Sequence, residues 1–287
     1  MTSDTTSPAT TALRAAAGLN LLTWPALDAS GAGAVVTARS GGVSAGPYAT
    51  LNLSFSVGDE RGWVLENRRR LAAAFGAGPG DFVFARQVHG ARVRVVTGDD
   101  RGSGAFSLDD AVGSAGGADA LVTTSPEVVL AILTADCVPI VLHDPAAGIL
   151  ACVHAGWRGT VAGVTAAAVA AMQDLGTRPS DVIAGIGPAI GADRYQVGPD
   201  VHEAVSRSFG PAAPAFSRPD PSAPARWLLD LPSANRHALR EAGVPGPRIH
   251  ATDLVTGPAP GHFFSDRAAR PCGRLALAAR LRPGGER

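Results

Sequence analysis

Three short apolar runs near the middle of the chain predict three neighbouring buried strands. The runs cover Val128–Leu133, Val138–Leu142 and Gly148–Val153. Short runs rich in Val and Ile and bounded by turn residues are typical of buried strands. Asp144-Pro145 predicts the turn between the second and third strands. Cys137 and His154 stand where runs break, so we expect a thiol and an imidazole at the ends of adjacent strands.

Alternating strand and helix patterns extend this core in both directions. The other predicted strands are Leu21–Trp24 and Ala34–Thr37 (joined by a Gly-rich turn), Phe82–Phe84, Arg92–Val96, Asp119–Thr123, Val182–Ile186, Tyr195–Val197, Trp227–Leu231 and Ile249–Leu254. The predicted helices are Asp59–Phe75, Thr160–Leu175, Asp200–Phe209, Pro232–Ala242 and an Arg-rich helix that closes the chain. Residues 1–19 are rich in Ser, Thr and Ala, and we expect a disordered tail there. Residues 97–118 predict a loop or lid, and no repeat or domain boundary appears.

Composition narrows the class of protein. The 287 residues are 46% hydrophobic and 17% charged, which is typical of a folded, soluble chain. With 25 basic and 25 acidic residues the net charge is +0, so no basic excess points to a nucleic-acid partner. No apolar run has transmembrane length, and the N-terminus is a poor signal peptide. Only three cysteines are present, which favours a reducing compartment, and we expect a cytoplasmic protein.

Three residues carry the candidate chemistry: His89, Cys137 and His154, each at a strand end beside Gly or Pro. Two imidazoles and a thiolate suit Zn²⁺ and leave a fourth position for water or substrate. The soft thiolate would also accept Cu²⁺, so the ligand types do not fix the metal. Alternatively, Cys137 is a nucleophile with His154 as its base. An isolated Cys in an apolar run is also often a small buried hydrophobe, and an isolated His is often structural.

Neighbouring polar residues suggest how a reactant would be held. Asp136 is an acid/base candidate, although an Asp at a strand end also caps backbone amides. Gln87 would bind substrate or orient His89. Arg158, in Gly156-Trp157-Arg158 at a helix start, indicates either an anion pocket or a solvated helix cap.

Two further candidates lie in the early Gly-rich segment 39–53. Arg39 would meet an anion, and Asn52 is a candidate substrate-binding residue. Alternatively, this segment is a tight surface loop that binds no ligand. The remaining Cys152, Cys272 and His143 are expected to be structural, with His143 at a turn or rim.

Several motifs together resemble one known family. They are QVHG at Gln87–Gly90, TADCVPI at Thr134–Ile140, VHAGWRGT at Val153–Thr160 and IGPAIG at Ile186–Gly191, with supporting matches in Arg39–Leu53 and the VGDE and ENRRRL segments. This combination is similar to the peptidoglycan editing factor family, also called the multicopper polyphenol oxidase or laccase-domain family, of purine nucleoside phosphorylase type. The resemblance covers roughly residues 20–280.

The resemblance implies a single α/β (α+β mixed) domain over residues 20–287, with a mixed β-sheet core flanked by helices. It implies a zinc site made by His89, Cys137 and His154. It also implies phosphorolysis of adenosine, inosine, guanosine and S-methyl-5′-thioadenosine, with phosphate as co-substrate, and deamination of adenosine. We expect small-molecule partners, no membrane or nucleic acid, and a monomer or small homo-oligomer.

Two other activities follow from the family's names. One is a peptidoglycan editing hydrolase with Cys137 as nucleophile; the other is a copper-dependent polyphenol oxidase (laccase). A multicopper centre needs many His ligands, and 7 His in the whole chain argue against the oxidase as the main activity. A module that binds nucleoside or metal without turnover is the non-enzymatic alternative.

The chain departs from the family pattern at its C-terminal side. Cysteines that family members often carry near Ala192-Asp193 and Ala251-Thr252 are absent, and the usual paired Arg after Phe-Phe-Ser is here Asp266-Arg267-Ala268. Arg267 and Arg274 are retained.

Overall fold

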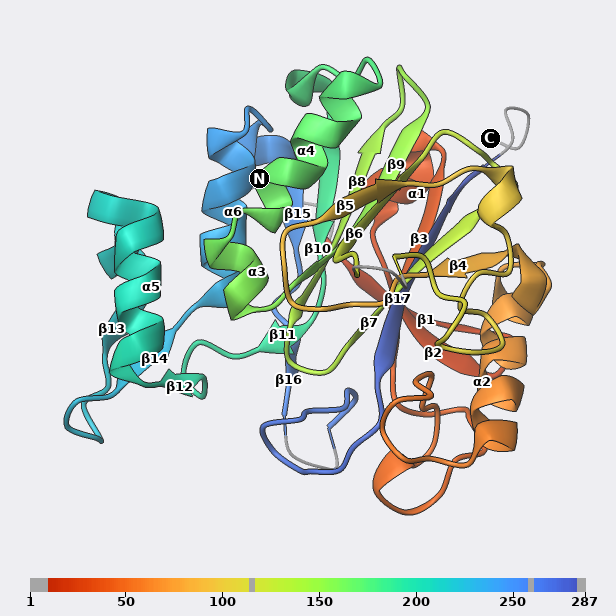
Figure 1. The fold of residues 1–287 in the computed structure, drawn as a ribbon, viewed down its shortest axis with the longest axis horizontal. Coiled ribbons are helices and arrows are strands. Elements are labelled where there is room, and N and C mark those ends of the chain that lie inside the picture. Colours follow the sequence, from red (N-terminus) through yellow and green to blue (C-terminus); the bar gives the residue numbers. More distant parts are fainter. Residues whose placement is uncertain (1–9, 114–116, 258–260, 283–287) are drawn as a thin grey trace, which may run out of the picture.

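Two six-stranded mixed sheets pack against each other at the centre of the molecule, and helices cover their outer faces (Figure 1). The computed structural model describes residues 10–113, 117–257 and 261–282. In order across the first sheet, the strands are β1 (Ala12–Ala16), β2 (Leu19–Thr23), β3 (Ala32–Thr37), β17 (Leu275–Leu281), β7 (Val129–Thr134) and β4 (Phe82–Phe84). In order across the second sheet, they are β15 (Ile249–Ala251), β10 (Ile183–Ile186), β8 (Val138–Asp144), β9 (Ile149–Ala155), β6 (Ala120–Thr123) and β5 (Val93–Val95).

Smaller elements surround these sheets. A two-stranded sheet pairs β11 (Ala189–Ile190) with β16 (Val255–Thr256), and a three-stranded sheet has the order β12 (Gln196–Val197), β14 (Trp227–Leu229), β13 (Ser217–Pro219). The α-helices are α1 (Pro25–Ser30), α2 (Arg61–Ala74), α3 (Trp157–Val161), α4 (Val164–Asp174), α5 (Pro199–Phe209) and α6 (Leu231–Glu241).

Alternation along the central strands explains the layers. Val141 of β8 and Cys152 of β9 face the first sheet, whereas Ile140 and Val153 face the opposite way, onto α4 and α6. The outer face of the first sheet packs on α2 through its Leu71. The order is therefore helix, sheet, sheet, helix, and strands buried on both faces read as continuous apolar runs. This mixed α/β domain confirms the predicted fold class.

The predicted central strands are confirmed as β7, β8 and β9, and β8 and β9 form a hairpin in which Val138 pairs with Ala155. The prediction of one helix over 160–175 is wrong, because Gly163 has a left-handed φ of 82° and separates α3 from α4. The predicted C-terminal helix is also wrong. The described part of this segment contains β17, which lies between β3 and β7 and is buried on both faces. The prediction failed because a short buried apolar run does not distinguish a helix from a strand.

The N-terminal part also differs from expectation. Strand β1 pairs with β2, so ordered structure begins before residue 20, while residues 1–9 lie outside the described part of the chain. Helix α1, rather than a simple Gly-rich turn, connects β2 to β3. In the parts of the chain that the structure describes, no helix has the length and apolar character needed to cross a membrane.

Candidate metal centre and the cavity around it

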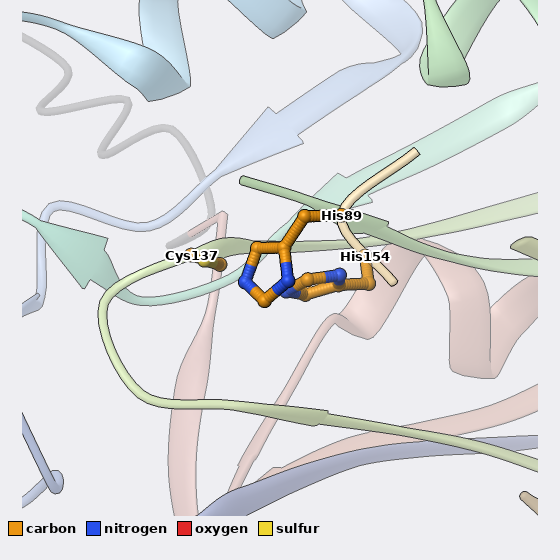
Figure 2. A group of neighbouring side chains, drawn as sticks. All are labelled: His89, Cys137 and His154. Atoms are coloured by element: carbon orange, nitrogen blue, oxygen red, sulfur yellow. The ribbon is translucent and has the colours of Figure 1, made fainter. Parts of the chain in front are cut away.

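The side chains of His89, Cys137 and His154 meet at one end of the second sheet (Figure 2). Cys137 directly precedes β8 and His154 lies in β9, so the hairpin register brings both to the same end. His89 comes from the segment that follows β4. The thiol and both imidazoles that the sequence singled out therefore lie close together.

The geometry of these three side chains suits a single metal ion. Their potential ligand atoms all lie within 4.8 Å of one another, and the two imidazole rings are 4.8 Å apart at 82°. Two ligands of one tetrahedral zinc ion with Zn–S and Zn–N bonds of about 2.3 and 2.0 Å are roughly 3.5 Å apart. A small contraction would therefore complete the site. All three residues line one cavity, so a fourth position would face that cavity.

A fully buried carboxylate, Asp119, holds two of these residues in place. Its Oδ1 lies 2.8 Å from Nδ1 of His154, which leaves Nε2 of that ring for the centre. The same carboxylate accepts backbone N–H groups from Val88, His89 and Gly90 at 3.3, 2.9 and 2.7 Å. Such a partner fixes the tautomer and orientation of a metal-binding imidazole.

Sequence reasoning assigned no role to Asp119, because its role depends on strand register. It immediately precedes β6, and β6 pairs with β9 so that Ala120 lies opposite Val153. Continuing that register places Asp119 opposite His154. A lone Asp at a strand start carries no such signal unless the pairing is known.

The site stabilises charge separation between Cys137 and His154. Burial by itself would raise the pKa of the Cys137 thiol, but the charge and hydrogen bonds of His154, with those of His89, lower it. Burial would lower the pKa of His154, but the Cys137 charge and the hydrogen bond to Asp119 raise it. A thiolate is the form that binds metals, and it is also the form that attacks electrophiles.

Two residues at the site have left-handed backbone conformations without being glycine. His89 has φ 60° and Asp136 has φ 84°. Such conformations are uncommon for non-glycine residues and persist where the surroundings fix them. The hydrogen bonds from backbone N–H groups to the Asp119 carboxylate fix this conformation at His89. For Asp136, the backbone carbonyl accepts the N–H of Ile190 at 3.0 Å and its Oδ2 accepts that of Arg267 at 2.7 Å.

Gly156 leaves the space that the ligands occupy. A Cβ added there would lie 2.9 Å from Sγ of Cys137 and 3.0 Å from Cδ2 of His89. Its φ of −74° suits any residue, so Gly156→Ala adds volume without backbone strain. Overpacking costs about 1–3 kcal/mol, and we expect metal affinity to fall about 10- to 100-fold. Gly62→Ala on α2, where a Cβ meets no heavy atom within 4 Å, is the matched control.

Chelator competition with zinc on both variants measures this effect. Gly62→Ala should keep wild-type affinity. Unchanged affinity in Gly156→Ala would show that the ligand side chains do not depend on the space at Gly156.

The cavity at the metal centre has a volume of about 570 Å³ and is rich in positive charge. Asp136 and Asp266 are its carboxylates among the described lining residues. The arginines among them are Arg68, Arg86, Arg158, Arg267, Arg270 and Arg274. Because the whole chain has net charge +0, this local excess indicates an anionic ligand.

Four of these arginines already have partners. Arg270 and Arg274 pair with Asp266, and Arg267 donates to the carbonyl of Gln196 at 2.9 Å. Arg68, 5% exposed, donates to the backbone carbonyls of Leu53 and Ala105 at 2.9 and 3.0 Å. Burial lowers the pKa of Arg68 to about 9, which leaves it charged at neutral pH.

Arg86 and Arg158 differ from these four. Neither has a carboxylate within salt-bridge distance among the described residues, and Arg158 lies 4.3 Å above the Trp157 ring. Both are exposed and line the cavity, so their guanidinium groups can meet a ligand. Arg86 was not among the candidates from the sequence.

Gln87 and Asp136 line the cavity, and the polar groups of both side chains form hydrogen bonds within the protein. The amide of Gln87 donates to the carbonyl of Leu133 and accepts its N–H, both at 2.7 Å. Gln87 thus fixes β7 beside the site, and its role toward substrate stays a prediction. The carboxylate of Asp136 accepts hydrogen bonds from the hydroxyl of Thr256 and the backbone N–H of Arg267. This is the capping role that the sequence offered as the alternative for Asp136. Its acid/base role stays a prediction.

Arg39 and Asn52 are not among the cavity-lining residues. Nε of Arg39 donates to the carbonyl of Ala49 at 3.0 Å, and its guanidinium lies 4.7 Å above the Phe264 ring. Asn52 is fully buried, and its Oδ1 accepts the N–H of Arg274 at 2.9 Å. Both shape the loop behind the cavity wall in this structure.

The three residues expected to be structural are buried. Cys152 lies within β9, and burial raises the pKa of its thiol. Cys272 is also buried. His143, expected at a turn or rim, lies instead inside β8, where its Nδ1 is 2.8 Å from the hydroxyl of Ser30.

Comparison with known proteins gives consistent matches over most of the chain. The family model described as multi-copper polyphenol oxidoreductase laccase matches residues 33–282. Purine nucleoside phosphorylase YlmD of Geobacillus stearothermophilus is 41% identical over 245 residues, which are 84% of this chain and 86% of the relative. A purine nucleoside phosphorylase of Deinococcus radiodurans is 43% identical over 229 residues, 80% of this chain and 81% of the relative.

Solved structures agree with the sequence matches. The crystal structure of YlmD from Geobacillus stearothermophilus superposes with a TM-score of 0.89 at 38% identity, covering 96% of this chain and 100% of that chain. The Bacillus licheniformis protein YfiH superposes with a TM-score of 0.86 at 32% identity, covering 91% and 96%.

Proposed function

The chain belongs to the multi-copper polyphenol oxidoreductase laccase family, and on that premise we propose that it is a zinc-dependent purine nucleoside phosphorylase. The observation that carries the proposal is a three-ligand site that opens into an arginine-rich cavity. The printed names of its relatives, at 41% and 43% identity, point to the same reaction. We propose adenosine, inosine, guanosine and S-methyl-5′-thioadenosine as substrates, with adenosine deamination as a second activity.

The donor set favours one zinc ion over a multicopper centre. Among the described residues, one group of three His, Cys or acidic side chains has ligand atoms close enough to share an ion. A bound zinc ion supplies Lewis acidity and lowers the pKa of its water to about 7. His89, Cys137 and His154 would hold it, with Asp119 orienting His154. Copper-dependent phenol oxidation would need more ligands than this group offers.

The cavity suits a nucleoside together with phosphate. Its volume of about 570 Å³ lies within the usual range for small-molecule sites. We propose that phosphate binds Arg158 and Arg86, whose guanidinium groups carry no carboxylate partner among the described residues. Trp157 and Tyr195 also line the cavity and offer aromatic surface for the purine.

In phosphorolysis, a phosphate oxygen forms a bond to the anomeric carbon while the bond from that carbon to the purine nitrogen breaks. The purine leaves with the bonding pair and takes up a proton. Arginines on the phosphate hold the attacking oxygen near the sugar, and positive charge develops on the sugar ring. Asp136 remains the proposed acid/base residue, in which case its bonds to Thr256 and Arg267 would orient it.

A nucleoside panel tests this function. Purified protein with its metal content measured is incubated with adenosine, inosine, guanosine and S-methyl-5′-thioadenosine, with and without phosphate. We expect free base only when phosphate is present, no turnover after chelation, and recovery on adding zinc. Adenosine should also release ammonia. Base release without phosphate would mean a hydrolase, and no release from any nucleoside would reject the proposal.

One observation favours a second function. His154 connects Cys137 to the buried Asp119, which is the order of groups in a Cys–His–Asp hydrolase. We therefore keep, as the alternative, a peptidoglycan editing hydrolase in which the Cys137 thiolate attacks a carbonyl of a cell-wall precursor. Rapid alkylation of Cys137 by iodoacetamide in metal-loaded protein, without metal loss, would favour this alternative.

A further inference from the structure

A buried hydroxyl in the cavity wall has no hydrogen-bond partner. Thr134 is the last residue of β7, is 1% exposed and lines the cavity. Its Oγ1 is buried and makes no hydrogen bond within the described parts of the chain. A buried hydroxyl without a partner is destabilising, so its persistence calls for an explanation.

Other buried threonines show that this protein normally satisfies such groups. Thr123 donates to the carbonyl of Val96 at 2.8 Å, and Thr165 donates to the side-chain oxygen of Asn235 at 2.6 Å. The buried Oγ1 of Thr177 also has no hydrogen-bond partner, but Thr177 is not among the cavity-lining residues. The orphaned group at Thr134 thus differs from that at Thr177 in belonging to a residue that lines the cavity.

Strand alternation directs the Thr134 side chain toward the metal centre. Ile132 of β7 and Cys152 of β9 both pack in the layer between the two sheets. Two residues further along each strand, Thr134 and His154 point into the same layer. Strands β7 and β9 contact each other, so both side chains contribute to the same end of that layer.

The backbone at this position is fixed on both sides. Thr134 pairs with Leu275 in the neighbouring strand β17. The preceding residue, Leu133, has its N–H and carbonyl held by the side chain of Gln87. The backbone that carries the hydroxyl is therefore fixed before any ligand arrives, which reduces the ordering cost of a hydrogen bond to the ligand.

From these observations we infer that Oγ1 of Thr134 hydrogen-bonds an oxygen atom of the bound reactant. A hydroxyl both donates and accepts, so the partner is either a phosphate oxygen or a sugar hydroxyl of the nucleoside. The inference rests on the proposed function for the identity of the reactant. It gives a ligand-contacting role to Thr134, the first residue of the TADCVPI motif, for which the sequence analysis had proposed no role.

Thr134→Val tests the inference because it removes the hydroxyl at nearly constant size. We expect kcat/KM for phosphorolysis to fall about 10- to 100-fold, the range for a lost hydrogen bond to a charged or developing-charge group. The melting temperature should stay equal or rise, since a buried orphan group is removed. Metal content should not change, and Thr134→Ser should retain activity.

Thr177→Val is the matched control, because it removes an equally orphaned hydroxyl outside the cavity. It should also keep or raise the melting temperature while leaving kcat/KM at the wild-type value. An increase in the KM for phosphate alone in Thr134→Val would identify a phosphate oxygen as the partner. An increase in the KM for inosine alone would identify a sugar hydroxyl.

Three outcomes would overturn the inference. Wild-type kinetics in Thr134→Val would mean that the hydroxyl binds only water. Loss of activity together with lower melting temperature and lost metal would mean a structural role. If the wild type turns over no nucleoside, the proposed function fails first. Calorimetric titration of wild type and Thr134→Val with inorganic phosphate and with inosine then decides, and equal affinities, or no binding to either protein, would reject the inference.

Discussion

Replacing Cys137 with Ala is expected to weaken metal binding by more than about 100-fold, beyond the range seen for residues that only orient a ligand. The thiolate is the single anionic donor among the three clustered ligands described, and its loss leaves two imidazoles. If the proposed function holds, nucleoside turnover falls with the metal. Metal content by atomic emission and base release from inosine in phosphate measure both effects.

Cys152→Ala is the control for this experiment. Cys152 is buried in β9 on the face shared with His154, and its alanine variant should lose about 1 kcal/mol of stability while keeping metal and activity. Iodoacetamide separates the two roles of Cys137. Zinc should protect a ligand thiolate from alkylation, and activity that survives metal removal but disappears on alkylation would favour the hydrolase.

Asp119→Asn is expected to reduce metal affinity about 10- to 100-fold and to destabilise the fold by about 3 kcal/mol. The carboxylate accepts from three successive backbone amides and from His154 at once. A carboxamide replaces one acceptor oxygen with a donor, so either the loop carrying His89 or the imidazole of His154 loses its partner. Chelator competition and denaturant unfolding of the metal-free protein measure the two effects separately.

Asp144→Asn provides the matched comparison. Asp144 is also buried, and its Oδ1 accepts the N–H groups of Ala146 and Ala147 at 2.9 and 3.1 Å in the turn between β8 and β9. It does not line the cavity, so its asparagine variant should lose stability without losing metal affinity. Equal metal affinity in the two variants would show that Asp119 supports the fold and not the site.

The sequence predicted features that depend on neighbouring residues better than features that depend on contacts between segments far apart in the chain. The β8–β9 hairpin lies within 18 consecutive residues, 138–155, and its apolar runs and turn predicted both strands. The neighbouring positions of Cys137 and His154 came with that hairpin. By contrast, the apolar run of β17 resembles a helix locally, and only its position between β3 and β7 makes it a strand.

The sequence by itself predicted the central strands, because local periodicity and turn residues encode them, and its family motifs implied the mixed α/β class. Tertiary structure alone decided that Asp119 lies opposite His154, that Arg86 lines the cavity while Arg39 does not, and that the Thr134 hydroxyl has no partner. These features depend on register and on contacts between segments far apart in the chain. No local pattern specifies such pairings, since they are selected by the total burial and hydrogen bonding of the folded protein.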